Sequence, residues 1–329
     1  MQGALREVLE AIYEQEFLPC SYGFRPKRSA HDALRAVNHM VFQEGTGWIL
    51  ELDFQAFFDS VDRTKLIAML RERVVDGSFL RLVGKCLHVG VLDGADYSTP
   101  DVGTVQGSVI SPLLGNVYLH HVLDRWFEEE VKPELVGHAR LIRYADDAVL
   151  GFVRREDAEQ FLVRLTSRVE DFGLTLHPDK TRLLSFRPPD PGKPRGPKSA
   201  TFDFLGFTMF WRRGRHGGWA LGMKTQTAKR RRAIMALRDW CRRHRHLPRK
   251  EQHAALARRL RGHYGYFGVN GNIASLKSVH YAAHLNWWKW LRRRGQRGKR
   301  LTWERFKRYL DAIPLPPPRI CVQIWGRAP

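Results

Sequence analysis

The charge of this chain is divided sharply along its length. Residues 211–329 carry 30 Lys and Arg against 4 Asp and Glu, whereas residues 1–210 carry 25 Lys and Arg against 30 Asp and Glu. A length of 329 residues is enough for two domains, each with its own core. We therefore predict two domains, 1–210 and 211–329, with a polar, glycine-broken turn over residues 211–218 near their boundary.

The basic half restricts the partners of the chain. A strongly cationic field attracts polyanions, and neutralising their phosphates releases counterions. An anionic membrane is the competing partner, but the basic segments interleave Arg with Trp and Tyr and lack one long amphipathic face. No run approaches the roughly 18 apolar residues that span a bilayer. We expect nucleic acid as the partner and no membrane.

The four cysteines are far apart in the sequence and form no C-x-x-C pair. This spacing argues against a disulfide framework or a zinc module and favours a reducing cytoplasm of the bacterial type.

Hydrophobic periodicity gives a mixed first domain and a helical second one. Apolar runs predict strands at 48–54, 140–144 and 148–153, with a tight turn between the last two. Ser111 followed by Pro112 has the chemistry of a helix start, with Ser as the cap. In the basic half, helices are expected at 228–244, 251–267, 274–294 and 302–311. The predicted class is α+β with an antiparallel sheet, followed by an all-helical domain.

Three aspartates stand at the ends of the predicted strands. Asp53 ends the first strand, and Asp146 and Asp147 lie at the hairpin tip. Buried neighbouring carboxylates repel each other unless a cation compensates them. Together they would hold two divalent ions about 4 Å apart, and an all-oxygen ligand set suits Mg²⁺. The alternative is structural: Asp-Asp is commonly a solvated turn, and Asp53 could end or cap a strand.

The segments around these aspartates decide between the two interpretations. Tyr-Ala-Asp-Asp, residues 144–147, lies between two apolar strands. Five other segments accompany it: residues 21–34, 52–62 and 103–119 before it, and residues 173–181 and 202–207 after it. They resemble, in this order, the motifs of the reverse transcriptases encoded by group II introns, within the retron-type superfamily. The resemblance implies a right-hand polymerase with fingers, palm and thumb.

By this resemblance, Asp53 and Asp146 would bind both Mg²⁺ ions, with the Phe54 carbonyl as an added ligand and Asp147 as a weaker one. Phe58 lies five residues after Asp53, where the family places the bulky side chain that excludes a ribose 2′-hydroxyl; a core aromatic is the alternative.

Two further positions carry implied roles in nucleotide binding. Gln106 and Gly107 would contact the incoming deoxynucleoside triphosphate from a glycine-containing loop. Val105 departs from the family pattern, in which Pro is usual, so the shape of this loop is expected to differ.

Three cations are candidates for contacts with the triphosphate. Arg25 and Arg28 could clamp it, because a guanidinium binds phosphate in bidentate fashion, or they could be solvated residues of the fingers. Lys180 resembles the lysine that protonates departing pyrophosphate.

The basic half resembles the maturase domain of the same family, on residues 263–272 and 287–297. This domain acts as a helical thumb and contacts intron RNA. Its arginines suit phosphates and its aromatic side chains suit unpaired bases. We expect two of Trp287, Trp288 and Trp290 to be core residues. The predicted RNA contacts are Arg230, Arg231, Arg232, Arg242, Arg243, Arg292 and Arg293.

Together these features predict an RNA-directed DNA polymerase of a group II intron, with a maturase role. The expected partners are intron RNA, an RNA template with a DNA primer, dNTP and a second copy of the chain. Relatives place a further basic segment ahead of residue 21, so the fingers are expected to be partial: the chain is a fragment, or a partner supplies the segment, or template binding is weakened. The alternatives are a catalytically impaired splicing maturase and a retron-like or defence-associated reverse transcriptase.

Overall fold

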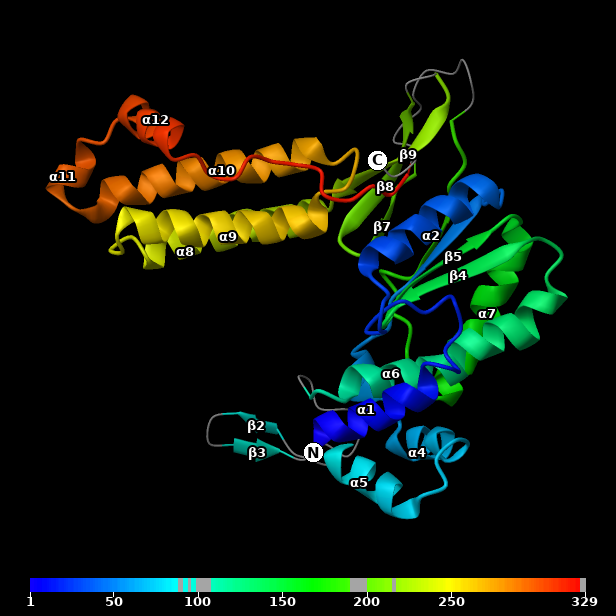
Figure 1. The fold of residues 1–329 in the computed structure, drawn as a ribbon. Coiled ribbons are helices and arrows are strands. Elements are labelled where there is room, and N and C mark those ends of the chain that lie inside the picture. Colours follow the sequence, from blue (N-terminus) through cyan, green and yellow to red (C-terminus); the bar gives the residue numbers. More distant parts are fainter. Residues whose placement is uncertain (88–90, 94–95, 99–107, 190–199, 215–216, 326–329) are drawn as a thin grey trace. The chain divides into compact units, whose positions relative to one another are not determined.

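The computed structural model describes residues 1–87, 91–93, 96–98, 108–189, 200–214 and 217–325. The chain divides into two compact units, Met1–Leu205 and Gly206–Pro329. The division falls five residues before the predicted boundary. The helices and strands are drawn in Figure 1.

The first unit combines helices with an antiparallel sheet. Its helices are α1 (Gln2–Tyr13), α2 (Ala30–Gln43), α3 (Phe57–Ser60), α4 (Arg63–Arg71), α5 (Gly77–Leu87), α6 (Ser111–Leu119) and α7 (Arg155–Asp171). Its strands are β1 (Trp48–Leu52), β2 (Val91–Asp93), β3 (Asp96–Ser98), β4 (Ala139–Tyr144), β5 (Asp147–Phe152), β6 (Arg182–Ser185) and β7 (Phe202–Phe204). The predicted α+β class is confirmed.

Helix α6 continues without a break into irregular helical turns. Two π-helical segments, His120–Asp124 and Trp126–Val131, follow it, and a 3₁₀ turn, Lys132–Glu134, ends the run. The predicted cap at Ser111 is wrong: the helix begins there, Ile110 is the N-cap residue, and the Ser111 side chain is buried.

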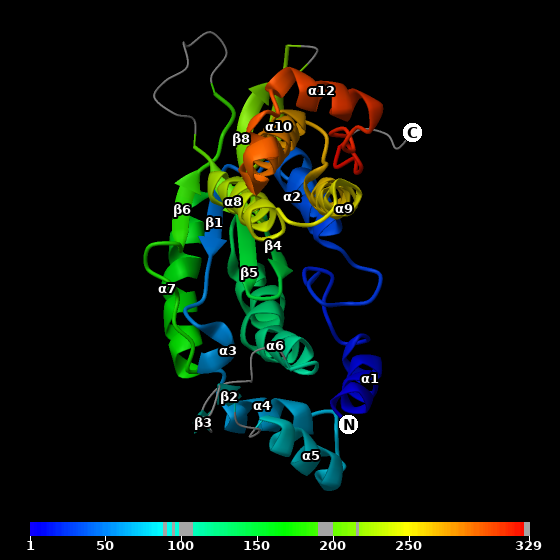
Figure 2. The same ribbon diagram turned by 90° about the vertical axis from the view of Figure 1, so that its left-hand side faces the viewer.

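The central sheet has the strand order β4-β5-β1-β6, visible edge to edge in Figure 2. All its pairings are antiparallel; Leu52 pairs with Ala148 and Tyr144 pairs with Asp147. Successive side chains of a strand point to opposite faces. Leu50 and Leu150 belong to a core shared with α6 and α7, whereas Gly151 lies against Met40 of α2. The sheet is therefore covered on both faces, which explains its almost continuous apolar strands.

The link between β4 and β5 is a two-residue turn made by Ala145 and Asp146. Ala145 has a φ of +56°. A positive φ at the first turn residue is typical of a type II′ hairpin turn, which matches the twist of the strands. The position is strained for a residue other than glycine, so the surrounding structure must hold it.

The second unit begins with a β-hairpin of β8 (Phe207–Arg213) and β9 (Trp219–Thr225), so the prediction of an all-helical second domain is wrong. The predicted turn at 211–218 is thus wrong over Trp211–Arg213, because these residues continue a strand whose alternate side chains, including Met209 and Trp211, are buried. The hairpin leads into α8 (Thr227–Arg243), α9 (Arg249–Phe267) and α10 (Ile273–Leu291), then the 3₁₀ turn η4 (Arg292–Arg294), α11 (Gln296–Lys299) and α12 (Trp303–Ala312).

A separate hydrophobic core joins α8, α9, α10 and α12. Trp287 and Trp290 are buried in it, whereas Trp288 is half-buried and packs edge-on against Trp303. The prediction that two of these three tryptophans are core residues is confirmed. The Trp287 indole N–H also donates to Gln252 Oε1 at 2.7 Å, and both residues are buried.

In the described ranges, no helix has the length and apolar character needed to cross a membrane.

We expect Trp287→Phe to lower the free energy of unfolding of the second unit by about 2–4 kcal/mol. The change removes buried ring area and leaves Gln252 Oε1 without its donor. Chemical denaturation followed by circular dichroism measures the loss. The exposed Tyr281 on the same helix supplies the control, and Tyr281→Phe should change stability by less than about 0.5 kcal/mol. Equal effects of the two variants would contradict the assignment.

Candidate active site

The sheet brings three segments that are distant in sequence to one edge. Asp53 directly follows β1, Asp146 is in the β4–β5 turn, and Lys180 lies two residues before the start of β6. Since β1 lies between β5 and β6, Asp53 lies between the other two segments. The structure therefore gathers Asp53, Asp146 and Lys180, which the sequence assigned to one site.

Asp53 is held by a cross-strand ion pair. Lys180 Nζ lies 2.7 Å from Asp53 Oδ2, and the Asp53 side chain is about one-quarter exposed. The backbone fixes the base of this residue, because the His177 N–H donates to the Asp53 carbonyl at 2.7 Å. Lys180 is thus beside the carboxylate, and its ammonium shows that this position attracts a cation.

A second ion pair adjoins the first, and the sequence reasoning missed it. Glu51 pairs with Arg182 across β1 and β6, with Arg182 Nη2 at 2.6 Å from Glu51 Oε2, and Glu51 also accepts from the Asp203 N–H at 2.7 Å. Burial raises the pKa of Glu51, although Arg182 opposes the shift. The signal was a charged residue in an otherwise apolar strand, two positions before Asp53.

The pKa of the Asp146 carboxyl is raised as well. Burial raises its pKa above the ordinary value, and the negative charge of Asp53 raises it further, while Arg143 and Lys180 lower it. Asp53 and Asp146 therefore share one electrostatic site. Asp147 is exposed at the first position of β5 and is not as enclosed as Asp146.

The residues of this site fit a divalent cation. Two carboxylates whose repulsion favours the neutral acid are stabilised as anions when a cation lies between them. The Phe54 carbonyl is a further candidate oxygen. The Asp53 carbonyl accepts from the His177 N–H and the Gln55 N–H donates to the Thr175 carbonyl, so both groups face residues 175–177. In an extended chain the intervening Phe54 carbonyl faces the opposite side, where β5 and Asp146 lie.

The predicted cage of three carboxylates is not formed by the described residues. No group of three His, Cys, Asp or Glu side chains within those ranges is placed so that it could hold a metal ion. The fit therefore rests on Asp53, Asp146 and a backbone carbonyl, and the weaker role predicted for Asp147 remains a prediction.

The aromatic residues after Asp53 turn away from an extended path. Ala56 is left-handed, and Phe57 then starts the short helix α3. Phe57 is buried and Phe58 half-buried, with their rings 5.2 Å apart. Both rings lie against Gly115 of α6, where a Cβ would come within 3.0 Å of Phe57 and 3.2 Å of Phe58. Phe57 is a core residue, and the excluding role of Phe58 stays a prediction.

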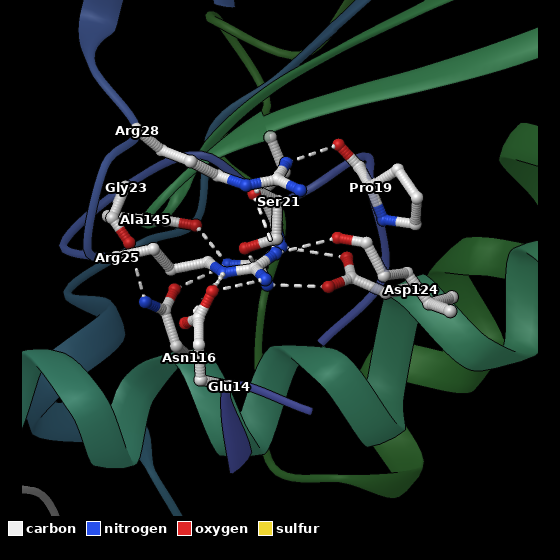
Figure 3. A network of polar contacts seen from close by, with 11 residues as sticks. Glu14, Pro19, Ser21, Gly23, Arg25, Arg28, Asn116, Asp124 and Ala145 are labelled. Atoms are coloured by element: carbon white, nitrogen blue, oxygen red, sulfur yellow. Dashed lines mark hydrogen bonds and ion pairs between the residues drawn. The ribbon is translucent and has the colours of Figure 1, made fainter. Parts of the chain in front are cut away.

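Arg25 does not have the expected freedom to bind a triphosphate. Its side chain is almost wholly buried, and it donates to Glu14 at 2.7 Å and to the carbonyls of Leu18 and Ser21 at 2.8 and 3.0 Å (Figure 3). These bonds occupy the nitrogens that would grip phosphate. The structure gives Arg25 a structural role in place of the predicted one.

Arg28 is less enclosed. It donates to the Pro19 carbonyl at 2.8 Å and to the Ser21 carbonyl at 3.1 Å, and its guanidinium lies over the Tyr22 ring. Its contact with a triphosphate stays a prediction. Gln106, Gly107 and Val105 lie outside the described residues.

The sequence of this chain is similar to known proteins over the segments that form the site. The family model described as reverse transcriptase (RNA-dependent DNA polymerase) matches residues 1–209. The chain belongs to the reverse transcriptase family. Because the match runs through β1, the β4–β5 turn and β6, it includes all three segments that form the site.

Several of the relatives have the names of intron proteins. The chain is 36% identical over 144 residues to the group II intron-encoded protein LtrA of Lactococcus lactis, covering 41% of this chain and 24% of that protein. It is 46% identical over 134 residues to an uncharacterized 91 kDa protein in the cob intron of Schizosaccharomyces pombe, covering 41% of this chain and 16% of that protein. The group II intron family predicted from the motifs is confirmed.

A longer match is to the protein YkfC of Escherichia coli, 31% identical over 252 residues, covering 66% of this chain and 62% of that protein. The chain thus spans less than two thirds of each of these relatives. Among solved structures, apo telomerase from Candida tropicalis superposes with a TM-score of 0.52 at 12% identity, covering 95% of this chain and 54% of that chain. This likeness supports the right-hand polymerase fold.

The raised pKa of Asp146 predicts a pH-dependent gain of stability in Asp146→Asn. A carboxyl with a raised folded pKa contributes stability that is present at acid pH and lost as the pH rises through that pKa. In EDTA at pH 7, the variant should therefore have a higher melting temperature than the parent, and the difference should vanish below about pH 3.5. Calorimetry across pH measures it. Asp311→Asn, at an exposed position, should show no such difference; a pH-independent gain would contradict the assignment.

Proposed function

We propose that the chain is the RNA-directed DNA polymerase of a group II intron and that it also acts as a maturase on intron RNA. The observation that carries the polymerase function is the shared electrostatic site of Asp53 and Asp146 at one edge of the sheet. Family membership supplies the reaction class, and the intron proteins among its relatives supply the context. The substrates are an RNA template with a DNA primer and dNTP.

In the proposed reaction the primer 3′-hydroxyl gives up its proton to water as its oxygen bonds to the α-phosphorus of dNTP, and the bond from that phosphorus to the bridging oxygen breaks, so that pyrophosphate leaves. Asp53, Asp146 and the Phe54 carbonyl would hold two Mg²⁺ ions, which would supply positive charge to the reacting oxygens. Lys180, whose ammonium lies 2.7 Å from Asp53 Oδ2, would give a proton to pyrophosphate. Phe58 limits the space beside the sugar.

Replacing Asp146 tests the function directly. We expect Asp146→Asn to reduce primer extension on an RNA template by about 10³-fold or more, because an amide cannot supply the charge that holds the metal ions. Affinity for intron RNA should stay within about twofold. Asp311→Asn should extend at the parental rate. Full-rate extension by Asp146→Asn would refute the polymerase function and leave the alternative of a splicing maturase that has lost synthesis.

The second unit has the electrostatics of an RNA-binding surface. Among the described residues of 206–325, no Lys or Arg forms an ion pair with a carboxylate. Six of the seven predicted RNA contacts are exposed, and Arg230 is half-buried. Uncompensated cations on a rigid helical core favour phosphate binding and make it sensitive to salt.

Two predicted contacts line a hollow at the end of α10. The cavity has a volume of about 900 Å³ and is lined by Arg245, Leu285, Trp288, Lys289, Trp290, Arg292, Arg293, Gly295 and Lys299. Its five cations face no carboxylate in this lining. Arg292 and Arg293 lie over the rings of Trp288 and Trp290, each at 4.9 Å. This combination suits an RNA backbone with an unpaired base.

Charge reversal at this hollow should weaken RNA binding. We expect Arg292→Glu with Arg293→Glu to lower affinity for intron RNA at least tenfold and to reduce the slope of log affinity against log salt by roughly 2. Filter binding across salt concentrations measures both. The control is Arg305→Glu with Arg308→Glu, two exposed arginines of α12 outside the hollow. An equal loss in the control would show that only net charge matters.

All four cysteines are free, and three are buried. Together with the nucleic-acid partner, this supports a place in a reducing cytoplasm. The intact pair Asp53 and Asp146 favours an active polymerase over the impaired maturase.

A further inference from the structure

The buried Arg143 forms a hydrogen bond through every N–H group of its guanidinium. Arg143, at the end of β4, donates to Asp124 Oδ1 and Oδ2 at 2.7 and 2.5 Å, to Asn116 Oδ1, to the Ala145 carbonyl and to Ser21 Oγ, each of the last three at 2.9 Å. A guanidinium has five N–H donors, so none remains. Arg143, Asp124 and Ser21 are inaccessible to solvent, and Asn116 is nearly so.

One of these bonds reaches the turn that carries Asp146. The Ala145 carbonyl belongs to the peptide group that ends at the Asp146 nitrogen, and Ala145 has the strained φ of +56°. On its other side the turn contacts Gly23, where a Cβ would lie 2.4 Å from the Ala145 nitrogen. Asn116 joins the two sides, since its Nδ2 donates to the Gly23 carbonyl at 2.7 Å (Figure 3). The turn is therefore clamped between Arg143 and residues 21–23.

Stability alone does not explain a buried arginine at this place. Removing a pair such as Arg143 and Asp124 from water has a large desolvation cost, and apolar residues of similar size are often as stabilising. An apolar residue cannot supply a directed hydrogen bond to the carbonyl of Ala145, whose backbone φ is strained. Placement matters for chemistry, because a shift of about 1 Å can cost about 10²-fold in rate.

We propose that Arg143 is a positioning residue for catalysis, which holds the Ala145–Asp146 turn in the conformation that presents Asp146 beside Asp53. Residues 21–23 form the opposite side of the clamp, so the segment that contains Ser21, Gly23 and Arg25 supports the catalytic turn and does not bind nucleotide through Arg25. The proposal rests on the proposed polymerase function for its kinetic consequence, but its structural content can be measured without activity.

The first test is Arg143→Lys, which keeps the charge and cannot satisfy five acceptors. We expect kcat for single-nucleotide incorporation to fall about 10²-fold, with KM for dNTP and RNA affinity within threefold. Amide exchange measured by mass spectrometry should accelerate in the peptide covering residues 144–148 and stay unchanged in α7. The stability control is Leu165→Ala, a cavity variant in the buried face of α7; it should lower the melting temperature and leave kcat within threefold at 25 °C.

The second test approaches the turn from the other side and serves if Arg143→Lys does not fold. Gly23→Ala places a methyl group against the backbone of the turn, so kcat should fall at least tenfold with faster exchange in residues 144–148. The matched control is Gly84→Ala in α5, where nothing lies within 4 Å of the added Cβ, and both readouts should be parental.

The outcomes separate this proposal from the proposed function. Parental kcat and parental exchange in Arg143→Lys and Gly23→Ala would overturn the positioning role, as would an equal fall of kcat in Leu165→Ala. If the parent protein incorporates no nucleotide, the polymerase function fails, and the exchange of residues 144–148 alone decides whether Arg143 holds the turn.

Discussion

The antiparallel pairing of β1 with both β5 and β6 is the constraint on which the candidate site depends. One pairing places Leu52 opposite Ala148, and the other places Glu51 opposite Arg182. Each register follows from burial of the strand on both faces, because a slip by one residue would exchange every side chain between the faces. Because both registers are set, the chain after β1 places Asp53 between the turn that contains Asp146 and the start of β6.

Among the described residues at the same edge of the sheet, some charged side chains are paired with opposite charges inside the protein and Asp146 is not. Glu51 and Asp53 have cations across the strand, and Arg143 has a carboxylate, so these groups are compensated inside the protein. Asp146 is different: burial and the charge of Asp53 dominate its pKa, although Arg143 and Lys180 act against them. A carboxyl in such surroundings is stabilised as the anion by an external cation, and this agrees with the proposed metal-dependent reaction.

In the second unit, one set of residues forms the hydrophobic core and another forms the charged surface. In the second unit the core of α8, α9, α10 and α12 is built from aromatic and aliphatic residues, and its described cations make no ion pairs with carboxylates. Surface ion pairs contribute little to stability, so the unit loses little by leaving its arginines unpaired. It gains an electrostatic surface that a polyanion can neutralise, and stacked pairs such as Arg292 on Trp288 orient part of that surface.

The β8–β9 hairpin was not predicted from the sequence. Features encoded by local pattern could be predicted: the strands β1, β4 and β5, the helices α8, α9, α10 and α12, the hairpin that carries Asp146, and the family motifs. These depend on residues a few positions apart, where alternation and turn chemistry act. The roles of Arg25 and Arg143 and the pair of Glu51 with Arg182 depended on the tertiary structure. Arg143 meets Ser21 across 122 residues of sequence, and Arg182 meets Glu51 across 131. An arginine in a sequence has the same five donors wherever it lies, and only the folded chain determines whether they meet a phosphate or the protein itself.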